Sequence, residues 1–476
     1  MSRKTSVPVA VISRPGADYP AQPPFDPPNP VYEMVESALR SLGLDRGRVG
    51  TPEWNPLGDV IAPGDRVVIK PNFVASKNFH QVIKGEMLAC SSTHGSVLRP
   101  IIDYALRAAG PRGTVAVVDT PVEGCNVQQV LTGLGIEALL RYYRERGHHI
   151  EFYDLRKFQV VPRMLLDNVR RGGRSWNLGM LVREKLPGDP LGSQVVDLGS
   201  RSRFADVEQR GPHYRFHRSH LYTPVPHHTG GRHEYSLPRT VLFADAILNV
   251  AKMKTHKKSG VTMALKAVIG LCNEKYWLPH YTAGTVGEDG DEYPLRPPLW
   301  VRVENQLQRF PLPGDHSLIA RAPRISGPQN GLLRGYILEG SWDGNDTIWR
   351  TTLDLHDLVL HADRSGRVHD TPQRRCLVFV DGIIAGEGDG PLASTPRHAG
   401  LLCAGQDPVL VDLCCTRLMG FAPERVPTVW QALRRPLLAT SVAENLQEVV
   451  DGPLPSSSFV PPSTWENLTR ECPPVP

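Results

Sequence analysis

The chain has 476 residues, of which 40% are hydrophobic and 22% are charged, a composition typical of soluble globular proteins. The net charge is only +5 and the basic residues are spread along the chain, which argues against a dedicated nucleic-acid-binding protein. The eight cysteines form no CxxC pair, as expected for free thiols in a reducing compartment. No apolar run approaches the ~20 residues of a membrane span, so we expect a cytoplasmic protein without a membrane partner.

Apolar segments alternate between strand-like and helix-like spacing along much of the chain. Short strands are predicted at 8–12, 67–69, 115–118, 377–380 and 401–404. Helices are predicted at 31–42, 91–110, 130–144 and 408–420. Ser92 or Thr93 would cap the second of these helices and Asp407 the last. The repeated order of strand then helix predicts an α/β fold with a mostly parallel open sheet and helices on both faces, in a Rossmann-like three-layer arrangement.

Two long, loop-rich stretches interrupt this pattern, so we divide the chain into a core and its additions. The α/β core is predicted in three parts, at 61–157, 240–275 and 376–438. The additions are an N-terminal extension (1–60), an inserted Arg/His-rich segment (158–239), a second insertion (276–375) and a Pro-rich tail (439–476). The end of this tail is expected to be extended or disordered.

The first insertion contains a cluster of histidines between positions 212 and 233. Its members are His213, His217, His220, His227, His228 and His233. Clustering on this scale raises the question of a metal site, because imidazole is a common metal ligand. However, no pair has HxxxH spacing on a convincing helix, and the prolines and glycines between them indicate an irregular loop. The sequence leaves open whether this cluster binds metal.

The stretch from 241 to 274 predicts a strand, a cationic loop and a helix. The apolar run from Leu242 to Val250 is typical of a strand buried on both faces. The residues that follow include Lys252, Lys254, Thr255 and His256, and a second apolar segment at helical spacing starts at Gly260. Ligands of open α/β sheets bind beyond the carboxyl ends of strands, so this loop is a candidate site. Lys266, on the following helix, ranks lower, as a surface or ion-pair residue.

Polar residues end four of the predicted strands, and these ends lie at one edge of a parallel sheet. They are Lys70 with Asn72, Asp119, the cationic loop, and Asp381. Each could be an ordinary polar strand end, but together they predict a shared crevice. Lys70, Asn72, Lys252, Lys254 and Thr255 would bind a small anionic molecule, a carboxylate or a phosphate. His256 and His94 are the candidate catalytic residues, because an imidazole exchanges protons near neutral pH.

A glycine-rich segment after Asp381 carries two further carboxylates, Glu387 and Asp389. These three acids would repel an anion unless a divalent cation such as Mg²⁺ or Zn²⁺ lay between them, so they are predicted metal ligands. The alternative is that the segment is a solvated turn. No nucleotide-cofactor motif is present, since GEGDGP lacks both the GxGxxG context and a Walker lysine. GxSxG and HExxH motifs are absent as well.

Several motifs resemble the uncharacterised DUF362 family. They are KPN at 70–72, THGSVLRPIIDY at 93–104, LNVAKMKTHKKSGVTMALKAVIG at 248–270, VDGIIAGEGDGP at 380–391 and GQDPVLVD at 405–412. LPHYTAG and GDEYP resemble a longer subgroup of that family. Some members carry ferredoxin-type modules, but this chain lacks closely spaced cysteines, so the resemblance implies no iron–sulfur cluster here. The family often has asparagine after the lysine that corresponds to Lys266, where this chain has Ala267.

These observations predict a metal-assisted enzyme that acts on a small anionic substrate at the carboxyl edge of the sheet. The reaction class is open, and so is the question of whether the protein is an enzyme at all. Two alternatives are an iron–sulfur-associated redox partner protein, suggested by the family resemblance, and a non-catalytic anion-binding protein. The sequence gives no indication of the oligomeric state.

Overall fold

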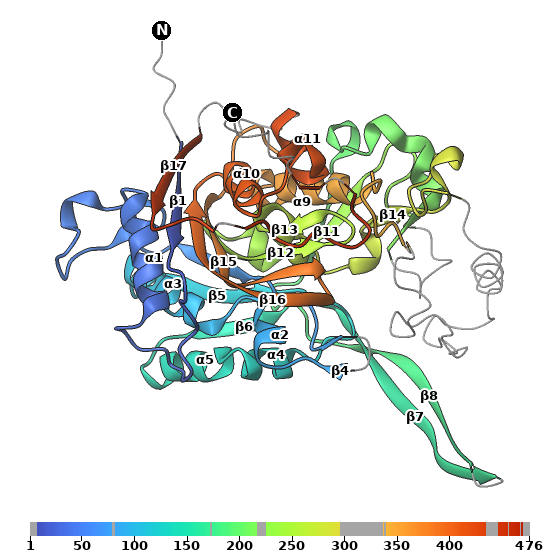
Figure 1. Ribbon diagram of the computed structural model, residues 1–476, viewed down its shortest axis with the longest axis horizontal. Coiled ribbons are helices and arrows are strands. Elements are labelled where there is room, and N and C mark those ends of the chain that lie inside the picture. Colours follow the sequence, from blue (N-terminus) through green and yellow to red (C-terminus); the bar gives the residue numbers. More distant parts are fainter. Residues whose placement is uncertain are drawn as a thin grey trace.

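The computed structural model describes residues 7–78, 81–171, 174–216, 225–295, 337, 339–434, 446–455, 457–466 and 468–469. A nine-stranded sheet forms the centre of the molecule (Figure 1). Its strands are β1 (Val7–Ser13), β2 (Arg66–Pro71), β5 (Thr114–Asp119), β6 (Ile150–Asp154), β12 (Ala246–His256), β13 (Gly260–Thr262), β15 (Arg375–Asp389), β16 (Ala393–Gly405) and β17 (Leu446–Asp451). Their order is β17-β1-β16-β15-β12-β2-β5-β6, with β13 beside β12.

Most neighbouring strands of this sheet run parallel. β15, β12, β2, β5 and β6 are parallel to one another, and β17 is parallel to β1. β16 runs antiparallel to both β1 and β15. The predicted α/β fold with a mostly parallel sheet is therefore confirmed.

Helices cover both faces of the sheet (Figure 1). One face packs on α1 (Pro30–Ser41), α3 (Gly95–Ala109), α4 (Val127–Gly133) and α5 (Ile136–Glu145). The other packs on α6 (Arg239–Leu242), α7 (Ala264–Ala267), α9 (Ile348–His361), α10 (Pro408–Leu418) and α11 (Pro427–Arg434). Leu248 of β12 packs in the core on the first of these faces, and Ile247 packs in the core on the other face, because successive strand side chains point to opposite faces.

The central stretch has different element boundaries from those predicted. Leu242 closes the short helix α6, and β12 continues past Val250 to His256, with every residue buried. The lysines therefore lie on a strand and not in a loop. The extension is possible because β13 folds back antiparallel on the end of β12 and supplies backbone partners, pairing Lys254 with Thr262. The helix expected to open at Gly260 begins only at Ala264.

The glycine-rich segment after Asp381 is a strand, whereas a loop was predicted. It forms the second half of β15 and pairs with β16 as far as Asp389 and Ala393. Glycine is required at position 386 for steric reasons. A Cβ there would lie 2.7 Å from the carbonyl oxygen of Cys90 and 2.9 Å from the Cβ of Lys254. The glycine at this position is therefore explained by close packing of the strand and not by a phosphate-binding turn.

One other expectation is corrected. His94, and neither Ser92 nor Thr93, caps α3, because its Nδ1 accepts a hydrogen bond from the Ser96 amide at 3.2 Å. In the C-terminal tail, β17 adds a parallel edge strand beside β1; the described residues after it contain no helix or regular strand, as expected for an extended end, but Phe459 and Trp465 among them are buried. These aromatic side chains give the tail apolar surface to bury, which its proline-rich composition did not indicate.

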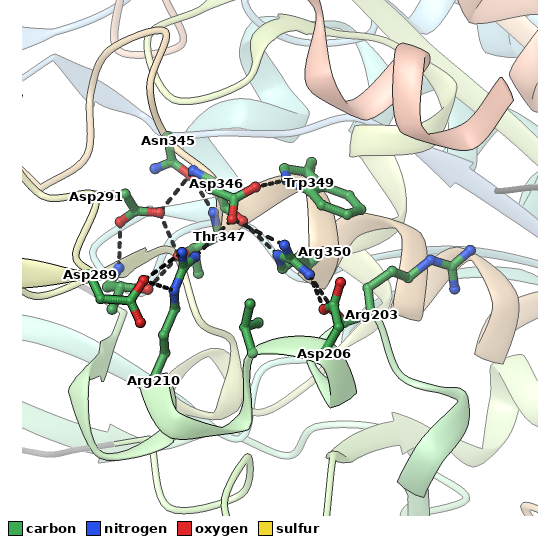
Figure 2. A network of polar contacts seen from close by, with 12 residues as sticks. Arg203, Asp206, Arg210, Asp289, Asp291, Asn345, Asp346, Thr347, Trp349 and Arg350 are labelled. Atoms are coloured by element: carbon green, nitrogen blue, oxygen red, sulfur yellow. Dashed lines mark hydrogen bonds and ion pairs between the residues drawn. The ribbon is translucent and has the colours of Figure 1, made fainter. Parts of the chain in front are cut away.

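The two predicted insertions contact each other. Figure 2 shows Arg210, from the 3₁₀ segment η4 (Ala205–His213), between Asp289 at 2.9 Å and Asp346 at 2.7 Å. Arg350 of α9 binds the same Asp346 at 3.0 Å and Asp206 at 2.5 Å. This network ties the start of α9 to the first insertion.

The first insertion also contains two antiparallel strand pairs. β7 (Phe158–Arg171) and β8 (Arg174–Lys185) form an antiparallel ribbon that projects from the body of the molecule (Figure 1). β9 (Ser193–Asp197) pairs with β11 (Glu234–Pro238). The division of the chain into seven parts remains a prediction. In the described part of the chain, no helix has the length and apolar character needed to cross a membrane.

Candidate functional site

Lys70 and Asp119 form a buried ion pair where β2 and β5 end. The Lys70 amine lies 2.9 Å from the Asp119 carboxylate, and both side chains are at most 1% exposed. Asp119 also accepts hydrogen bonds from the backbone amides of Phe73 and Thr120, both at 2.7 Å. Burial lowers the pKa of Lys70, and the Asp119 charge opposes that effect. Lys70 thus has a carboxylate partner within the fold, and its role as an anion ligand stays a prediction.

Lys252 and Asp381 form a second buried ion pair, at 3.0 Å, on neighbouring strands. The Tyr19 hydroxyl bridges them, since it accepts a hydrogen bond from Lys252 at 2.7 Å and donates one to Asp381 at 2.6 Å. The His94 amide donates to the same carboxylate at 3.2 Å, and the His94 ring stacks on Tyr19 at 4.1 Å. Burial first, and then the Asp381 charge, raises the pKa of Tyr19 well above its usual value. The bridging hydroxyl therefore keeps its proton.

His94 is the predicted catalytic residue that borders a cavity. The cavity has a volume of about 350 Å³, and Phe25, Glu137 and Arg141 are also among its lining residues. Burial lowers the pKa of His94 to about 4, so its ring is neutral near pH 7. The other predicted site residues do not line this cavity.

Lys254 is fully buried but faces neutral groups. Its amine donates hydrogen bonds to the side-chain oxygen of Asn72, at 2.7 Å, and to the carbonyl of Ser91. Burial, followed by the charge of Lys252, lowers the pKa of Lys254 well below its usual value. The structure thus brings Lys254 and Asn72 together, and within the described residues Lys254 contacts no carboxylate, the partner that a buried lysine normally requires.

Lys266 and Lys275 add two more buried amines near this edge. Lys266 is 9% exposed, and Lys275 is 7% exposed and donates a hydrogen bond to the Ile269 carbonyl at 2.7 Å. Burial lowers the pKa of Lys266 to about 7, helped by the charges of Lys275 and Lys258. Burial likewise lowers the pKa of Lys275 to about 8. Neither amine lies within 4.0 Å of a carboxylate oxygen in the described residues.

His256 lies at the end of β12 among these lysines. Its Nδ1 accepts a hydrogen bond from the Lys258 amide at 3.0 Å, so the neutral ring carries its proton on Nε2. Burial, then the charges of Lys266 and Lys254, lowers the pKa of His256 well below its usual value. Lys258 itself is paired with Glu339 at 3.6 Å. His256 is therefore a neutral imidazole inside a basic cluster.

Thr255 and two of the three predicted metal ligands are not part of this cluster. The Thr255 hydroxyl donates to the Gly388 carbonyl at 2.7 Å. Glu387 pairs with Arg397 at 3.0 Å, and Asp389 pairs with Lys257 at 3.1 Å. Asp381 is held by Lys252, so each of the three acids binds a different cation. Within the described residues, no group of three or more His, Cys, Asp or Glu side chains is arranged to hold a metal ion.

The histidine cluster of the first insertion is partly a buried aromatic core. His228 and His233 are fully buried, with ring centroids 5.7 Å apart, and burial lowers the pKa of both. His227 stacks on Trp277 at 3.5 Å. His213 is exposed, whereas His217 and His220 lie outside the described residues. Among the described histidines of this cluster and their neighbours, no three His, Cys, Asp or Glu side chains are placed to hold a metal ion, and whether the whole cluster binds metal stays open.

Sequence reasoning missed Tyr19 and Lys275 and ranked Lys266 too low. A usable signal existed for Lys266, because it stands inside an apolar run from Ala264 to Ile269, and a lysine there has no exposed face to occupy. Tyr19 and Lys275 lie in irregular segments without periodicity, so their positions depend on tertiary contacts.

The fold and the site define an α/β protein with a buried basic cluster at the carboxyl edge of its sheet. Residues 200–417 match the family model described as a domain of unknown function, DUF362. The predicted resemblance is confirmed for these residues, and membership of a longer subgroup stays a prediction.

Two further comparisons give weaker likenesses. A 53-residue match is 40% identical to the thylakoid-associated protein sll1697 of Synechocystis sp. and covers 11% of this chain and 16% of that protein. A crystal structure of a Thermotoga maritima protein from the Northeast Structural Genomics Consortium has 10% identity and a TM-score of 0.34, over 81% of this chain and 58% of that chain. The chain thus matches less than two thirds of either relative. Neither likeness supports a conclusion about activity, and the cytoplasmic location stays a prediction.

Proposed function

We propose that the protein binds a small anionic molecule, a carboxylate or a phosphate, at the carboxyl edge of its sheet. One observation carries the proposal: Lys254, Lys266 and Lys275 are buried, and none has a carboxylate partner in the described part of the chain. Lys70, Lys252 and Lys258 each have one. The cluster therefore has more amines than carboxylates.

The energetics of burial favour an anionic ligand for this cluster. A buried charge costs free energy unless it is paired. Because burial disfavours the charged form, the pKa values of the three lysines are lowered. An anion between them would stabilise their protonated forms. Thr262, which pairs with Lys254 across β13 and β12, and Asn273, two positions before Lys275, each have a buried side-chain oxygen without a hydrogen-bond partner among the described residues. The Thr262 hydroxyl could donate to a ligand oxygen.

Thermal unfolding in the presence of anions tests the proposal. Phosphate, sulfate, acetate and succinate are each titrated at constant ionic strength. A ligand at 100 times its Kd adds about 2.7 kcal/mol of stability, which raises Tm by about 2–5 °C. Lys254→Met and Lys275→Met should lose most of this rise, and Lys84→Met, at an exposed lysine, should keep it. Equal shifts in all variants would assign the anion to another surface.

The divalent metal ion remains a separate prediction, because the positions of Asp381, Glu387 and Asp389 give it no support. Elemental analysis of untagged protein tests it. Stoichiometric Mg²⁺ or Zn²⁺ that disappears in Asp389→Asn would establish metal binding at these acids, and unchanged metal content would remove them as ligands. The catalytic roles of His256 and His94 and the redox-partner alternative likewise stay predictions.

A further inference from the structure

The backbone around Lys266 is held by hydrogen bonds from neighbouring elements, whereas its amine has no hydrogen-bond or ion-pair partner among the described residues. The carboxylate of Asp412, on α10, accepts hydrogen bonds from the amides of Ala264 at 2.8 Å and Leu265 at 2.9 Å. From β12, Asn249 donates to the Ala264 carbonyl at 2.9 Å. Two neighbouring elements thus hold α7 in place. The Lys266 amine itself makes no hydrogen bond or ion pair with any described residue.

The groups that face this amine are lysines and neutral imidazoles. Lys275 and Lys258 act directly on it from η7 (Lys275–Trp277) and from the turn after β12. Its charge in turn acts on Lys254, His256 and His280. The acids that act on these two lysines include Glu339, which is paired with Lys258 at 3.6 Å, and Asp119, which is paired with Lys70 at 2.9 Å; Asp291 and Glu292 act on Lys258 as well. Nothing in this arrangement favours a permanent charge on Lys266.

An amine in such surroundings has a well-defined chemical use. A lysine that is desolvated and placed beside other cations keeps a large neutral fraction, and its free electron pair makes it a nucleophile toward carbonyl carbon. The neighbouring protonated amines can hold an anionic group on the same ligand. A ligand with a carbonyl next to a carboxylate would use both properties at once.

We propose that Lys266 forms an imine with the carbonyl carbon of a small 2-oxo acid or aldehyde acid, whose carboxylate is held by Lys275 and Lys254. The inference rests on the proposed function, since it requires that the edge bind an anion. The Lys266 nitrogen adds to the carbonyl carbon to give a carbinolamine, and the former carbonyl oxygen then leaves as water while the C=N bond forms. Both hydrogens of that water come from the amine, and nothing is oxidised or reduced.

Reductive trapping tests the inference. The full chain is incubated at pH 7 with pyruvate or glyoxylate and sodium cyanoborohydride, and the modified lysines are located by peptide mass spectrometry. An ordinary lysine pKa of about 10.4 leaves less than about 0.1% of the amine neutral at this pH, whereas a pKa near 7 leaves about half neutral. We therefore expect the Lys266 peptide to be labelled at least about tenfold more than the peptides of exposed lysines such as Lys84.

Matched controls separate imine formation from general labelling and from loss of folding. Lys266→Arg keeps a cation and Lys266→Met removes it; both should fold, as judged by cooperative thermal unfolding, and both should lose the specific label. Acetone, which has a carbonyl but no carboxylate, should label Lys266 less than pyruvate does. Acetate, which has a carboxylate but no ketone or aldehyde group, should protect Lys266 from pyruvate without forming an adduct.

The outcomes also distinguish this inference from the proposed function. Labelling spread evenly over surface lysines, or a label at another site that persists in Lys266→Arg, would overturn the imine. If pyruvate raises Tm through Lys254 and Lys275 but never labels Lys266, the anion site stands and the imine fails. If no anion changes Tm and no label forms, both fail.

Discussion

Lys252 and Lys254 lie two positions apart on β12 and point to the same face of the sheet, yet among the described residues only Lys252 contacts a carboxylate. Its amine is 3.0 Å from Asp381, whereas the Lys254 amine reaches only the neutral oxygens of Asn72 and Ser91. Both side chains are fully buried. The first lysine is therefore paired within the fold, whereas the second has no carboxylate partner in the part of the chain that the structure describes.

This difference predicts opposite consequences for two similar substitutions. Lys252→Met leaves the buried Asp381 charge without its cation, so we expect the free energy of unfolding to fall by about 3–5 kcal/mol. Lys254→Met removes an unpaired cation and leaves two neutral oxygens without a donor, for a loss below about 2 kcal/mol. Urea unfolding at pH 7 measures both values. A larger loss in Lys254→Met would mean that Lys254 is the structural lysine of the two.

The sequence predicted the fold better than it predicted which side chains of the site pair with each other. Alternating apolar segments were enough to predict the parallel sheet, because buried strands such as β2 and β12 need continuous apolar residues. The convergence of Lys70, Asp119, Lys252 and Asp381 at one edge also followed from strand polarity. Their pairing did not, since a lysine at a strand end gives no sign of which carboxylate lies on the neighbouring strand.

The acidic residues illustrate what local sequence cannot decide. Glycines around Glu387 and Asp389 are compatible with a loop or with a tightly packed strand, and only the pairing of β15 with β16 selects the strand. That strand directs Glu387 toward Arg397, which lies on β16 between the two quoted motifs at 380–391 and 405–412. In the same way, the burial of Lys266 depends on α9, α10 and α11, which pack over α7.

Stability should depend on pH in the range where the buried lysines titrate. The pKa is about 7 for Lys266 and about 8 for Lys275 in the folded chain, and both are lowered from 10.5. Between about pH 7 and 10 the unfolded chain holds more protons, so the free energy of unfolding should rise with pH, by at most about 1.4 kcal/mol per pH unit for each group. Lys266→Met should reduce this slope and Lys84→Met should not. Denaturant unfolding in buffers free of phosphate and carboxylates measures the slope, and a slope unchanged in Lys266→Met would contradict the burial of a titrating amine there.

Gly270 should tolerate no side chain, because it closes over the Lys70–Asp119 pair. An added Cβ would lie 2.2 Å from Asp119 Oδ1 and 2.6 Å from Lys70 Nζ, both of which are buried and held by other contacts. Gly270→Ala should therefore lower the free energy of unfolding by about 1–3 kcal/mol. Gly124→Ala is the matched control, since a Cβ at that exposed position meets no atom within 4 Å. Similar losses in the two variants would show that the pair can move aside.

Asn72→Asp offers the most direct test of the unpaired lysine. The substitution changes only the amide of Asn72, whose oxygen is 2.7 Å from the Lys254 amine, to a carboxylate of nearly the same shape. The new carboxylate would form the ion pair that Lys254 lacks and would compete with any anion for it. We expect the free energy of unfolding to stay within about 1–2 kcal/mol of the original, because the new charge is paired at once.

The same variant should lose the anion-dependent rise in Tm. Asn126→Asp is the control, because it makes the same chemical change at the exposed cap of α4, where aspartate caps as well as asparagine. Thermal unfolding of both variants with and without phosphate or acetate measures the effect. If Asn72→Asp kept the full anion response, Lys254 would not be an anion ligand, and the response would have to come from Lys266 and Lys275 alone.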